Sequence, residues 1–446
     1  MADIVLHDTL TGELLALRPR DPGRVGIYAC GPTVYSRIHI GNARPFVVFS
    51  LLGRFLAHEG YAVDLVVNVT DVNDKIYVAA AAQGRPSAEL AAEMTELYRR
   101  DTDALGIGRP GHEPLASETM QPIRDYIQAL LERDHAYASG GDVYFRVRSD
   151  QRYGSLSHRL LDSMDQGEDV EGAALKEDPL DFALWKAHKA GEDTFWEAPW
   201  GRGRPGWHIE CSAMAEQRLG LGFDIHGGGS DLVFPHHENE AAQTRAARGS
   251  ELARIWMHNG MIQMTGEKMA KSAGNIAPLH QVIESHGRDA VIMYLVSGHY
   301  RQPLAFSEAS LQQAAANVRR IREAGRRLVA GESPGHLAEV RDRFFEALAR
   351  DFNTPEALSV MNEWIARADP EGAGDSHLRE MLAVLGLENL LDADVQAPSA
   401  VVALAQERER ARQARDFAAA DRLRAEIAEH GWEVRDGAQG PSLLPL

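Results

Sequence analysis

The pattern of hydrophobic and polar residues predicts a strand, a helix and a second strand near the start of the chain. The apolar run at residues 25–30 ends at a Gly-Pro pair, which is typical of a buried strand. Residues 42–59 carry apolar side chains at helical spacing, and residues 62–69 are rich in β-branched side chains. This order predicts a parallel βαβ unit, and ligands bind such sheets at the carboxyl ends of the strands. Cys30 and Thr70 lie at those ends.

Two changes of pattern follow later in the chain. Short strand-like pieces among acidic loops indicate an inserted module, after which a strand, a glycine-rich turn and a helix return. From Ser307 onward nearly every segment has amphipathic helical spacing, ending with a helix at residues 400–430 and a short unit around residues 432–435. We therefore predict an α/β fold with a doubly wound parallel sheet, followed by an α-helical half. The expected segments are residues 1–110 and 204–262 for the α/β domain, 111–203 for the inserted module, 263–310 for a connecting region, 311–396 for a helical bundle and 397–446 for a small C-terminal unit.

Composition and charge narrow the class of protein. With 446 residues, 44% of them apolar, the chain is long enough for several domains. No apolar run is long enough to span a bilayer, and the first residues lack the regions of a signal peptide. We therefore expect a cytoplasmic protein without a membrane partner. The net charge of −18 disfavours indiscriminate nucleic-acid binding, but the basic run at residues 318–328 is either a local nucleic-acid contact or a solvated helix face.

Residues 234–240, which read FPHHENE, raise the question of a metal site. If a helix begins after Pro235, His236 and Glu240 share one face of it, while His237 and Glu238 point elsewhere. An imidazole and a carboxylate on one face can hold two corners of a tetrahedral zinc site. Taken alone, such a pair is more often an exposed pair on a helix surface.

The two cysteines of the chain change this balance. Cys30 ends a strand at the ligand-binding edge, and Cys211 lies just before the next elements of the sheet. Each taken alone is compatible with an inert buried thiol. Two thiolates, one imidazole and one carboxylate nevertheless form a suitable donor set for zinc.

Three other stretches have features that suit a nucleotide. The loop at residues 32–42 leads into a helix N-terminus, which favours a phosphate group. The glycine-rich turn at residues 227–231 can cradle adenosine, with Asp231 bonding the ribose hydroxyls. Lys268 and Lys271 lie in a flexible loop and can move onto a developing pyrophosphate. Each stretch taken singly is equally compatible with an ordinary loop.

The order of these motifs resembles that of a known family. HIGN at residues 39–42 and KMAKS at residues 268–272 resemble the HIGH and KMSKS signatures of class I aminoacyl-tRNA synthetases. The resemblance implies a class I Rossmann-like catalytic domain with an inserted connective peptide. The chain is similar to the cysteinyl-tRNA synthetases in particular, from about residue 3 to the tail, in the stretches YACGPTVY, NVTDVNDK, LWK, GWHIECSAM, HGGGSD, FPHHENE and DFNTP.

This resemblance implies one zinc ion per chain, which binds the thiol of the substrate. A thiolate binds zinc far better than an alcohol does, so the ion distinguishes cysteine from serine. Four protein ligands fill a tetrahedron, so the substrate needs a fifth position or the displacement of one ligand. The implied ligands are Cys30, Cys211, His236 and Glu240, and Thr70 and Trp207 are expected to line the cysteine pocket.

The resemblance also implies a two-step reaction that uses L-cysteine, ATP and tRNA(Cys). The cysteine carboxylate attacks the α-phosphorus of ATP, which arrives with Mg²⁺, and the terminal ribose hydroxyl of the tRNA then takes the cysteinyl group. Such chemistry depends mostly on positioning and charge stabilisation. The implied ATP-binding residues are His39, Gly41, Asn42, Lys268, Lys271 and Ser272, with Gly228, Gly229 and Asp231 at the adenosine.

The two signatures depart from the family pattern at single positions. Asn42 stands where the family has the last histidine of HIGH, and a neutral amide donates a hydrogen bond but carries no charge. Ala270 stands in the middle of the second signature, which leaves both lysines in place.

For tRNA, the resemblance implies a helical half that contacts the stem and a C-terminal unit that reads the anticodon. Basic side chains suit the phosphates, and an aromatic ring suits an unpaired base. The resemblance also implies a monomer. The expected tRNA-binding residues are Arg319, Arg320, Arg326, Trp432 and Arg435.

The alternative function is that of a related ligase, which joins cysteine to an amino sugar in mycothiol synthesis and lacks a tRNA-reading tail. The tail of this chain continues to Leu446, which favours the synthetase. An inactive RNA-binding relative is disfavoured because His39, Lys268, Lys271 and both cysteines are present.

Overall fold

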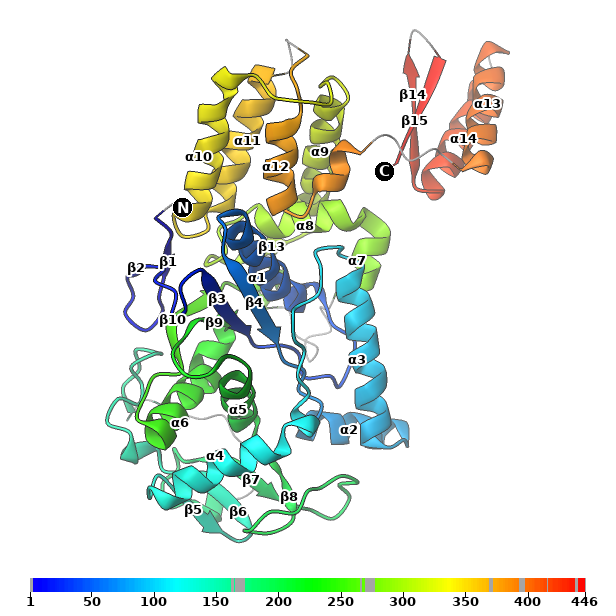
Figure 1. Cartoon of the computed structure of the whole chain (residues 1–446). Coiled ribbons are helices and arrows are strands. Elements are labelled where there is room, and N and C mark those ends of the chain that lie inside the picture. Colours follow the sequence, from blue (N-terminus) through cyan, green and yellow to red (C-terminus); the bar gives the residue numbers. More distant parts are fainter. Residues whose placement is uncertain are drawn as a thin grey trace.

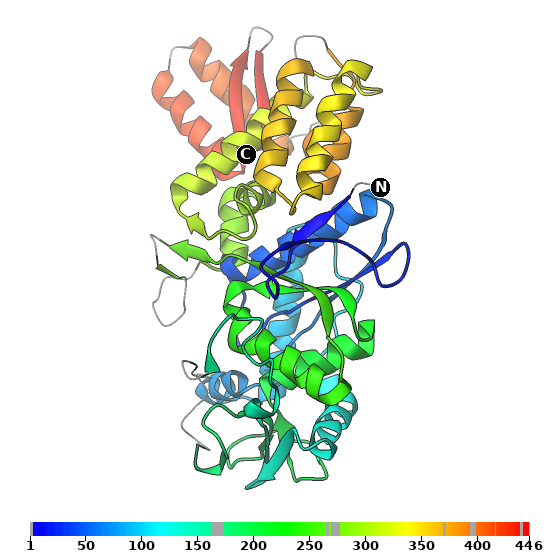
Figure 2. The same ribbon diagram turned by 90° about the vertical axis from the view of Figure 1, so that its left-hand side faces the viewer.

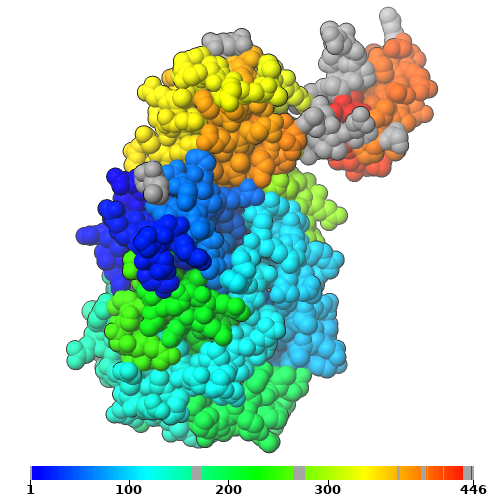
Figure 3. Space-filling model, in the orientation of Figure 1, coloured from blue at the N-terminus to red at the C-terminus, as the bar shows by residue number. Residues whose placement is uncertain are grey.

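Figure 1 shows an α/β body in the middle of the molecule, with an inserted module at one end and a bundle of helices at the other. A small C-terminal unit stands beside the bundle, and the space-filling view in Figure 3 shows it as a separate lobe. Within the described residues, no helix is long and apolar enough to cross a membrane. This computed structural model describes residues 3–161, 164, 173–264, 267–268, 277–368, 372–392, 398–414, 416–437 and 440–445.

The central sheet consists of four parallel strands in the order β10-β9-β3-β4. These are β3 (Arg24–Ala29), β4 (Ala62–Val67), β9 (Phe223–Gly229) and β10 (Ala253–Asn259). Helix α1 (Ile40–His58) connects β3 to β4 and confirms the predicted βαβ unit. Because later strands add on the other side of β3, the sheet is doubly wound and its switch point lies between β3 and β9.

The side chains of β3 point alternately into two hydrophobic cores, one on each face of the sheet. Val25 and Ile27 belong to the main core, together with the buried face of α1. Tyr28 and Cys30 belong to a second core on the opposite face, together with Cys211 of α5 (Trp207–Leu219). Because side chains alternate along a strand, this register directs Cys30 toward α5.

The inserted module contains an antiparallel sheet in the order β5-β6-β7-β8. Helix α4 (Met120–Glu132) packs against α5 and against α6 (Glu238–Arg248), so the module shares a core with two helices of the α/β body. The strands are β5 (Ala136–Ser139), β6 (Asp142–Phe145), β7 (Phe182–Ala187) and β8 (Gly203–Pro205), and the preceding helices are α2 (Asp74–Gln83) and α3 (Ser87–Asp103).

Among the described residues, two small sheets and the six α-helices α7 to α12 lie outside the central sheet, the inserted module and the C-terminal unit. Figure 2 shows the helical half stacked on the α/β body, with the inserted module on the opposite side. The small sheets are the hairpin of β1 (Val5–His7) with β2 (Leu14–Ala16), and β11 (Ile262–Met264) between β12 (Glu267–Lys268) and β13 (Leu304–Phe306). The helices are α7 (Leu279–His286), α8 (Arg288–Val296), α9 (Glu308–Gly325), α10 (Ala338–Ala349), α11 (Thr354–Ala368) and α12 (Ser376–Val384).

The C-terminal unit pairs two helices with a hairpin. The prediction of a single helix at residues 400–430 is wrong, because the chain forms α13 (Ser399–Gln413) and α14 (Phe417–Glu429). The Asp416 carboxylate begins the second helix by accepting a hydrogen bond from the amide of Ala419 at 3.0 Å. The hairpin consists of β14 (Trp432–Gly437) and β15 (Gly440–Pro445). The buried core of the unit is Val401, Ala405, Ile427, Trp432 and Val434.

Candidate metal centre and nucleotide pocket

Four buried side chains from separate parts of the fold converge at the carboxyl end of β3. Their potential ligand atoms all lie within 4.8 Å of one another. The two sulfur atoms are 3.8 Å apart, the Cys30 Sγ is 3.7 Å from Glu240 Oε1, and His236 Nε2 is 3.1 Å from the same oxygen. The four residues are Cys30 after β3, Cys211 in α5, His236 before α6 and Glu240 within α6.

These distances suit one tetrahedral zinc ion. Zinc–sulfur bonds of about 2.3 Å place two sulfur ligands about 3.8 Å apart, and nitrogen and oxygen ligands at about 2.0 Å lie about 3.3 Å apart. The 3.8 Å between Cys30 and Cys211 matches the first separation, and the 3.1 Å between His236 and Glu240 is close to the second. The structure therefore brings together all four residues that the sequence proposed as a metal set.

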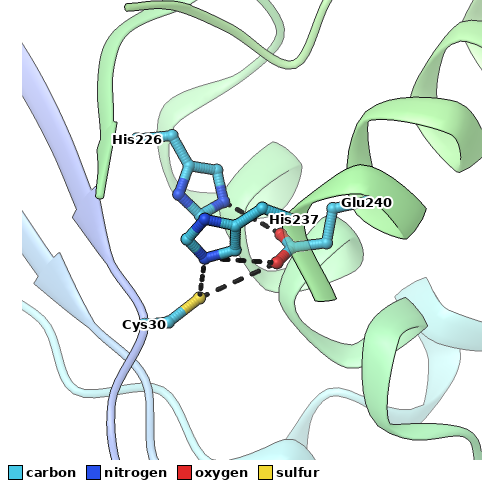
Figure 4. Close-up of side chains that lie close together, drawn as sticks. All are labelled: Cys30, His226, His237 and Glu240. Carbon is cyan, nitrogen blue, oxygen red and sulfur yellow. Dashed lines mark hydrogen bonds and ion pairs between the residues drawn. The ribbon is translucent and has the colours of Figure 1, made fainter. Parts of the chain in front are cut away.

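A second set of possible ligands overlaps the first. As Figure 4 shows, Cys30 and Glu240 also face His226 and His237. His237 Nε2 lies 3.2 Å from Cys30 Sγ, and His226 Nε2 lies 2.9 Å from Glu240 Oε2. This second set has only one thiolate, whereas two thiolates make the first set the better zinc site.

The expectation that the residues between His236 and Glu240 point elsewhere is wrong for His237. The chain reaches α6 through an irregular segment in which Phe234 is extended, with φ −139° and ψ 133°, and the helix begins only at Glu238. Because His236 and His237 precede the regular helix, both rings enter the buried centre. The signal that could have identified His226 is its place in a buried strand, directly before the glycines at 227–229.

Contacts with neighbouring rings orient His236. Its Nδ1 lies 2.9 Å from His208 Nδ1, and its ring stacks on Trp207 at 4.3 Å between ring centroids. The other ring nitrogen, Nε2, faces Glu240. A ligand histidine held through its second nitrogen is typical of metal sites.

Burial shifts the protonation of these groups in one consistent direction, toward their neutral forms. It lowers the pKa of His236, although Glu240 opposes the shift, and it lowers the pKa of His226 and His237 well below the usual range. It raises the pKa of Glu240 to about 7 and the pKa of the Cys30 thiol well above its usual range. Neutral imidazoles are ready to bind a metal, whereas the thiols must lose their protons on binding.

A cavity of about 270 Å³ opens from Cys30 and Trp207 to the N-terminus of α1. His39 caps that helix, because its Nδ1 accepts a hydrogen bond from the amide of Gly41 at 3.1 Å. The Asn42 Oδ1 accepts from the amide of His39 at 3.1 Å, so the amide nitrogen of Asn42 remains available as a donor. The helix N-terminus and these two side chains suit an anion.

The expected adenosine and lysine positions are only partly described. Gly229 and Asp231 line the same cavity, and Gly228 and Gly229 belong to the end of β9 rather than to a free turn. Lys268 lies in β12, and Lys271 and Ser272 lie outside the described residues.

Thr70, which was expected to line the cysteine pocket, is buried and is not among the residues that line this cavity. It is hydrogen-bonded to Asn68, a polar residue that the sequence did not single out. Its hydroxyl accepts a hydrogen bond from Asn68 Nδ2 at 3.3 Å, and Asn68 Oδ1 accepts from the amide of Gly31 at 2.9 Å. Glu210 is fully buried, and burial raises the pKa of its carboxyl well above the usual range, while Thr70 and Arg204 oppose that shift. The place of Glu210 in α5, three residues after Trp207 and directly before Cys211, was the only sequence signal for it.

The expected tRNA-binding residues lie in different surroundings. Arg319 lines a cavity of about 260 Å³ beside α7, α8 and α9, and Arg320 donates to Asn362 Oδ1 at 2.7 Å. Arg326 is exposed at the end of α9. Trp432 is only 7% exposed, so its ring packs within its own unit and offers little surface for stacking on a base, which argues against the expected role. Arg435 lies in β14.

The fold is that of the class I aminoacyl-tRNA synthetases. A solved structure of Mycobacterium tuberculosis methionyl-tRNA synthetase in complex with methionyl-adenylate matches with a TM-score of 0.60 at 16% identity, over 82% of this chain and 88% of that one. The LeuRS of Agrobacterium radiobacter, in a ternary complex with tRNA and LeuAMS, matches with a TM-score of 0.59 at 12% identity, over 84% of each chain.

Sequence comparison then identifies the family. The family model for the tRNA synthetases class I (C) catalytic domain matches residues 16–316, and that for the cysteinyl-tRNA ligase anticodon binding domain matches residues 394–440. The cysteine–tRNA ligases of Halorhodospira halophila and Alkalilimnicola ehrlichii are 43% and 44% identical, each over 98% of both chains. The chain belongs to the cysteinyl-tRNA synthetase family.

Proposed function

We propose that this protein is a cysteine–tRNA ligase, which activates L-cysteine with ATP and transfers it to tRNA(Cys). The observation that carries the proposal is a buried set of two cysteines, one histidine and one glutamate at the end of a cavity that also contains a capped helix N-terminus. The first feature suits a thiol substrate, and the second suits the phosphates of ATP. The family membership of the chain supports the same reaction.

In this proposal Cys30, Cys211, His236 and Glu240 hold one zinc ion per chain. Zinc supplies a soft Lewis acid that binds the thiol of cysteine far better than the hydroxyl of serine. The neighbouring groups prepare the site, because His208 orients the His236 ring and burial keeps the imidazoles neutral. Trp207 lines the cavity, and in this proposal it and Thr70 form the pocket for the rest of the amino acid.

The opposite end of the cavity binds ATP with its Mg²⁺. His39 and Asn42 donate to phosphate oxygens at the N-terminus of α1, and Gly41 gives the phosphates access to the backbone. Gly228, Gly229 and Asp231 hold the adenosine, while Lys268, Lys271 and Ser272 form a mobile clamp on the pyrophosphate. These groups position the cysteine carboxylate for attack on the α-phosphorus and stabilise the leaving pyrophosphate.

The helical half and the C-terminal unit bind the tRNA. Arg319, Arg320 and Arg326 contact its phosphates, and residues 397–446, with Arg435, read the anticodon. Residues 1–110 and 204–262 form the catalytic domain, residues 111–203 form the inserted connective module, and residues 263–310 contact the tRNA stem. The protein acts as a cytoplasmic monomer. The match of residues 394–440 to an anticodon-binding model favours this function over a cysteine–amino-sugar ligase.

The decisive experiment compares cysteine with serine in two assays on the purified protein. We expect cysteine-dependent exchange of pyrophosphate into ATP, charging of tRNA(Cys) with cysteine, and neither reaction with serine. Exchange without any tRNA charging, accompanied by consumption of an amino-sugar acceptor, would show that the proposed function is incorrect.

A further inference from the structure

Asn259 is a buried polar residue of the nucleotide cavity to which the proposed reaction gives no role. It is the last residue of β10, it is only 2% exposed, and it lines the cavity. Among the described residues, its side-chain oxygen Oδ1 has no hydrogen-bond partner. Because a buried polar atom without a partner is costly, such an oxygen beside a ligand cavity indicates a donor that arrives with the ligand.

The hydrogen bonds at the end of β10 fix which end of the Asn259 amide is the acceptor. The Nδ2 group donates to the carbonyl oxygen of Gly260 at 3.2 Å, and the same oxygen accepts from Nη1 of the buried Arg44 at 2.6 Å. A reversed amide would set the Asn259 oxygen against the Gly260 oxygen, with no proton between them. Oδ1 is therefore the end of the amide that is left for a ligand.

The place of Asn259 in the sheet limits which substrate it can meet. β10 lies two strands away from β3, and Asn259 pairs with Gly229 at the end of β9. Neighbouring strands are about 4.8 Å apart, so Asn259 lies roughly 10 Å along the sheet from the strand that precedes Cys30. In cysteine only two carbon atoms separate the nitrogen from the sulfur, so a cysteine bound at the metal centre does not reach Asn259 with its ammonium group. The donor therefore belongs to the nucleotide.

Within the nucleotide, the base has the matching donor. The proposed function gives the ribose hydroxyls to Asp231, which leaves the 6-amino group of adenine as the other donor of adenosine. A Cβ atom on Gly229 would lie 2.5 Å from Asp231 Oδ1 and 3.7 Å from Met261 Sδ, so these residues surround the same corner of the cavity. Met261 is apolar and flexible, so it suits the face of a base, and its movement can open Oδ1 of Asn259 to that base.

We propose that Asn259 is a specificity-determining residue whose Oδ1 accepts a hydrogen bond from the 6-amino group of the adenine of ATP. This inference rests on the proposed function, because it concerns how that reaction selects its nucleotide. Guanine and hypoxanthine carry a carbonyl oxygen where adenine carries the amino group. GTP and ITP would therefore set two acceptors against each other in a buried place, so Asn259 rejects them as well as holding ATP.

The test removes the hydrogen bond from either side, in the full-length, zinc-loaded protein. On the nucleotide side, ATP is compared with purine riboside triphosphate, which has a hydrogen atom in place of the 6-amino group. 2′-Deoxy-ATP is the matched control for the ribose. On the protein side, Asn259→Leu keeps the approximate size of the side chain and removes the acceptor. Cysteine-dependent pyrophosphate exchange gives kcat/KM for each nucleotide, together with the KM for cysteine.

We expect the wild-type protein to prefer ATP to purine riboside triphosphate by about 10-fold in kcat/KM, the usual weight of a hydrogen bond whose partner is left buried. In Asn259→Leu this preference should disappear, because the activity with ATP falls to the level of the analogue, and the rejection of ITP should weaken. The preference for ATP over 2′-deoxy-ATP should be the same in both proteins. Zinc content and the KM for cysteine should stay unchanged.

Three results would overturn the inference. The first is equal use of ATP and purine riboside triphosphate by the wild-type protein. The second is a preference for ATP that persists unchanged in Asn259→Leu, which would show a structural role. The third is a loss, in that variant, of the preference for ATP over 2′-deoxy-ATP, which would place Asn259 at the ribose.

If Asn259→Leu does not fold, Asn259→Ala decides on the same terms, because it also lacks the acceptor and adds no bulk. The comparison of the two nucleotides in the wild-type protein needs no variant. A wild-type protein without cysteine-dependent exchange in the presence of ATP would instead contradict the proposed function itself.

Discussion

At the scale of single residues, three of the four proposed zinc ligands have a buried polar neighbour that the sequence did not reveal. His236 contacts His208, Cys30 contacts His237, and the second oxygen of Glu240 contacts His226. Such neighbours orient ligands and tune their basicity. Because of His226 and His237, two overlapping sets of residues could bind the metal, and substitution of single histidines can show which set does so.

Replacement of single histidines should distinguish the two sets. We expect His236→Ala to lose the zinc ion, because it removes a ligand of the set with two thiolates, and His237→Ala to retain it. Zinc content per chain, measured after gel filtration, checks this, with Cys211→Ser as a second variant that should lose zinc. Loss of zinc in His237→Ala, with zinc retained in His236→Ala, would select the other set.

The buried histidines should make the zinc-free protein less stable in mild acid. Burial lowers the pKa of His258 to about 3, so below about pH 6.5 the unfolded chain takes up a proton that the folded protein does not, and stability falls with pH. Glu240, whose pKa is raised to about 7, and Glu210, whose pKa is raised well above its usual range, act in the opposite direction but are outnumbered. The other buried histidines with lowered pKa are His208, His226, His236 and His237.

Thermal unfolding of chelator-treated protein at pH 7.5 and pH 5.5 tests this dependence. We expect a lower Tm at pH 5.5, and a smaller difference between the two pH values in His258→Gln, which lacks one of the groups. An equal or higher Tm at pH 5.5 would contradict the prediction.

At the scale of elements, the N-terminus of α1 combines a structural cap with the phosphate-binding role proposed for it. His39 and Asn42 form reciprocal hydrogen bonds with the backbone of the first helical turn. These bonds fix the side chain of Asn42, which lines the cavity. In the proposed reaction, this arrangement allows a neutral asparagine to serve at this position.

Asn42→Ala should therefore reduce kcat/KM for ATP by about 10-fold, because it removes both a cap and a donor to phosphate. Asn73→Ala is the matched control, since Asn73 also caps a helix, through Lys75, but does not line the cavity. Pyrophosphate exchange at varied ATP concentration measures both variants. Equal losses in the two would show that capping alone is responsible.

At the scale of the whole molecule, the C-terminal unit is a separate body with its own small core. Its two helices and hairpin pack on one another around Ile427 and Trp432, and Figure 1 shows it standing beside the bundle and far from the inserted module. The metal centre lies instead between the central sheet and α5 and α6. The proposed function therefore places activation of cysteine and selection of tRNA in different parts of the chain.

A chain that ends at residue 396 should keep cysteine-dependent pyrophosphate exchange within about twofold but lose most of its tRNA charging, because among the described residues the core of the removed unit is separate from the cluster that contains Cys30 and Cys211. Initial rates of both reactions at equal protein concentration check this. Unchanged charging would show that the C-terminal unit does not read the tRNA.

Much of the fold followed from local patterns. The apolar run before Cys30 and the helical spacing after Asn42 predicted the βαβ unit, because burial on both faces and a 3.6-residue period are local properties. The break between α13 and α14 could not be predicted in the same way, since the pattern on either side remains helical; in the described residues the second helix begins at the cap formed by Asp416.

The sequence by itself determined the donor chemistry of this protein: two cysteines, a histidine and a glutamate, together with two nucleotide signatures in the expected order. Only the tertiary structure decided which further groups surround those donors. His226, His237 and Glu210 come from a strand, an irregular segment and a helix, and their spacing carries no common signal. Their convergence depends on how the sheet and helices pack, and contacts between distant parts of a chain leave no periodic trace in its sequence.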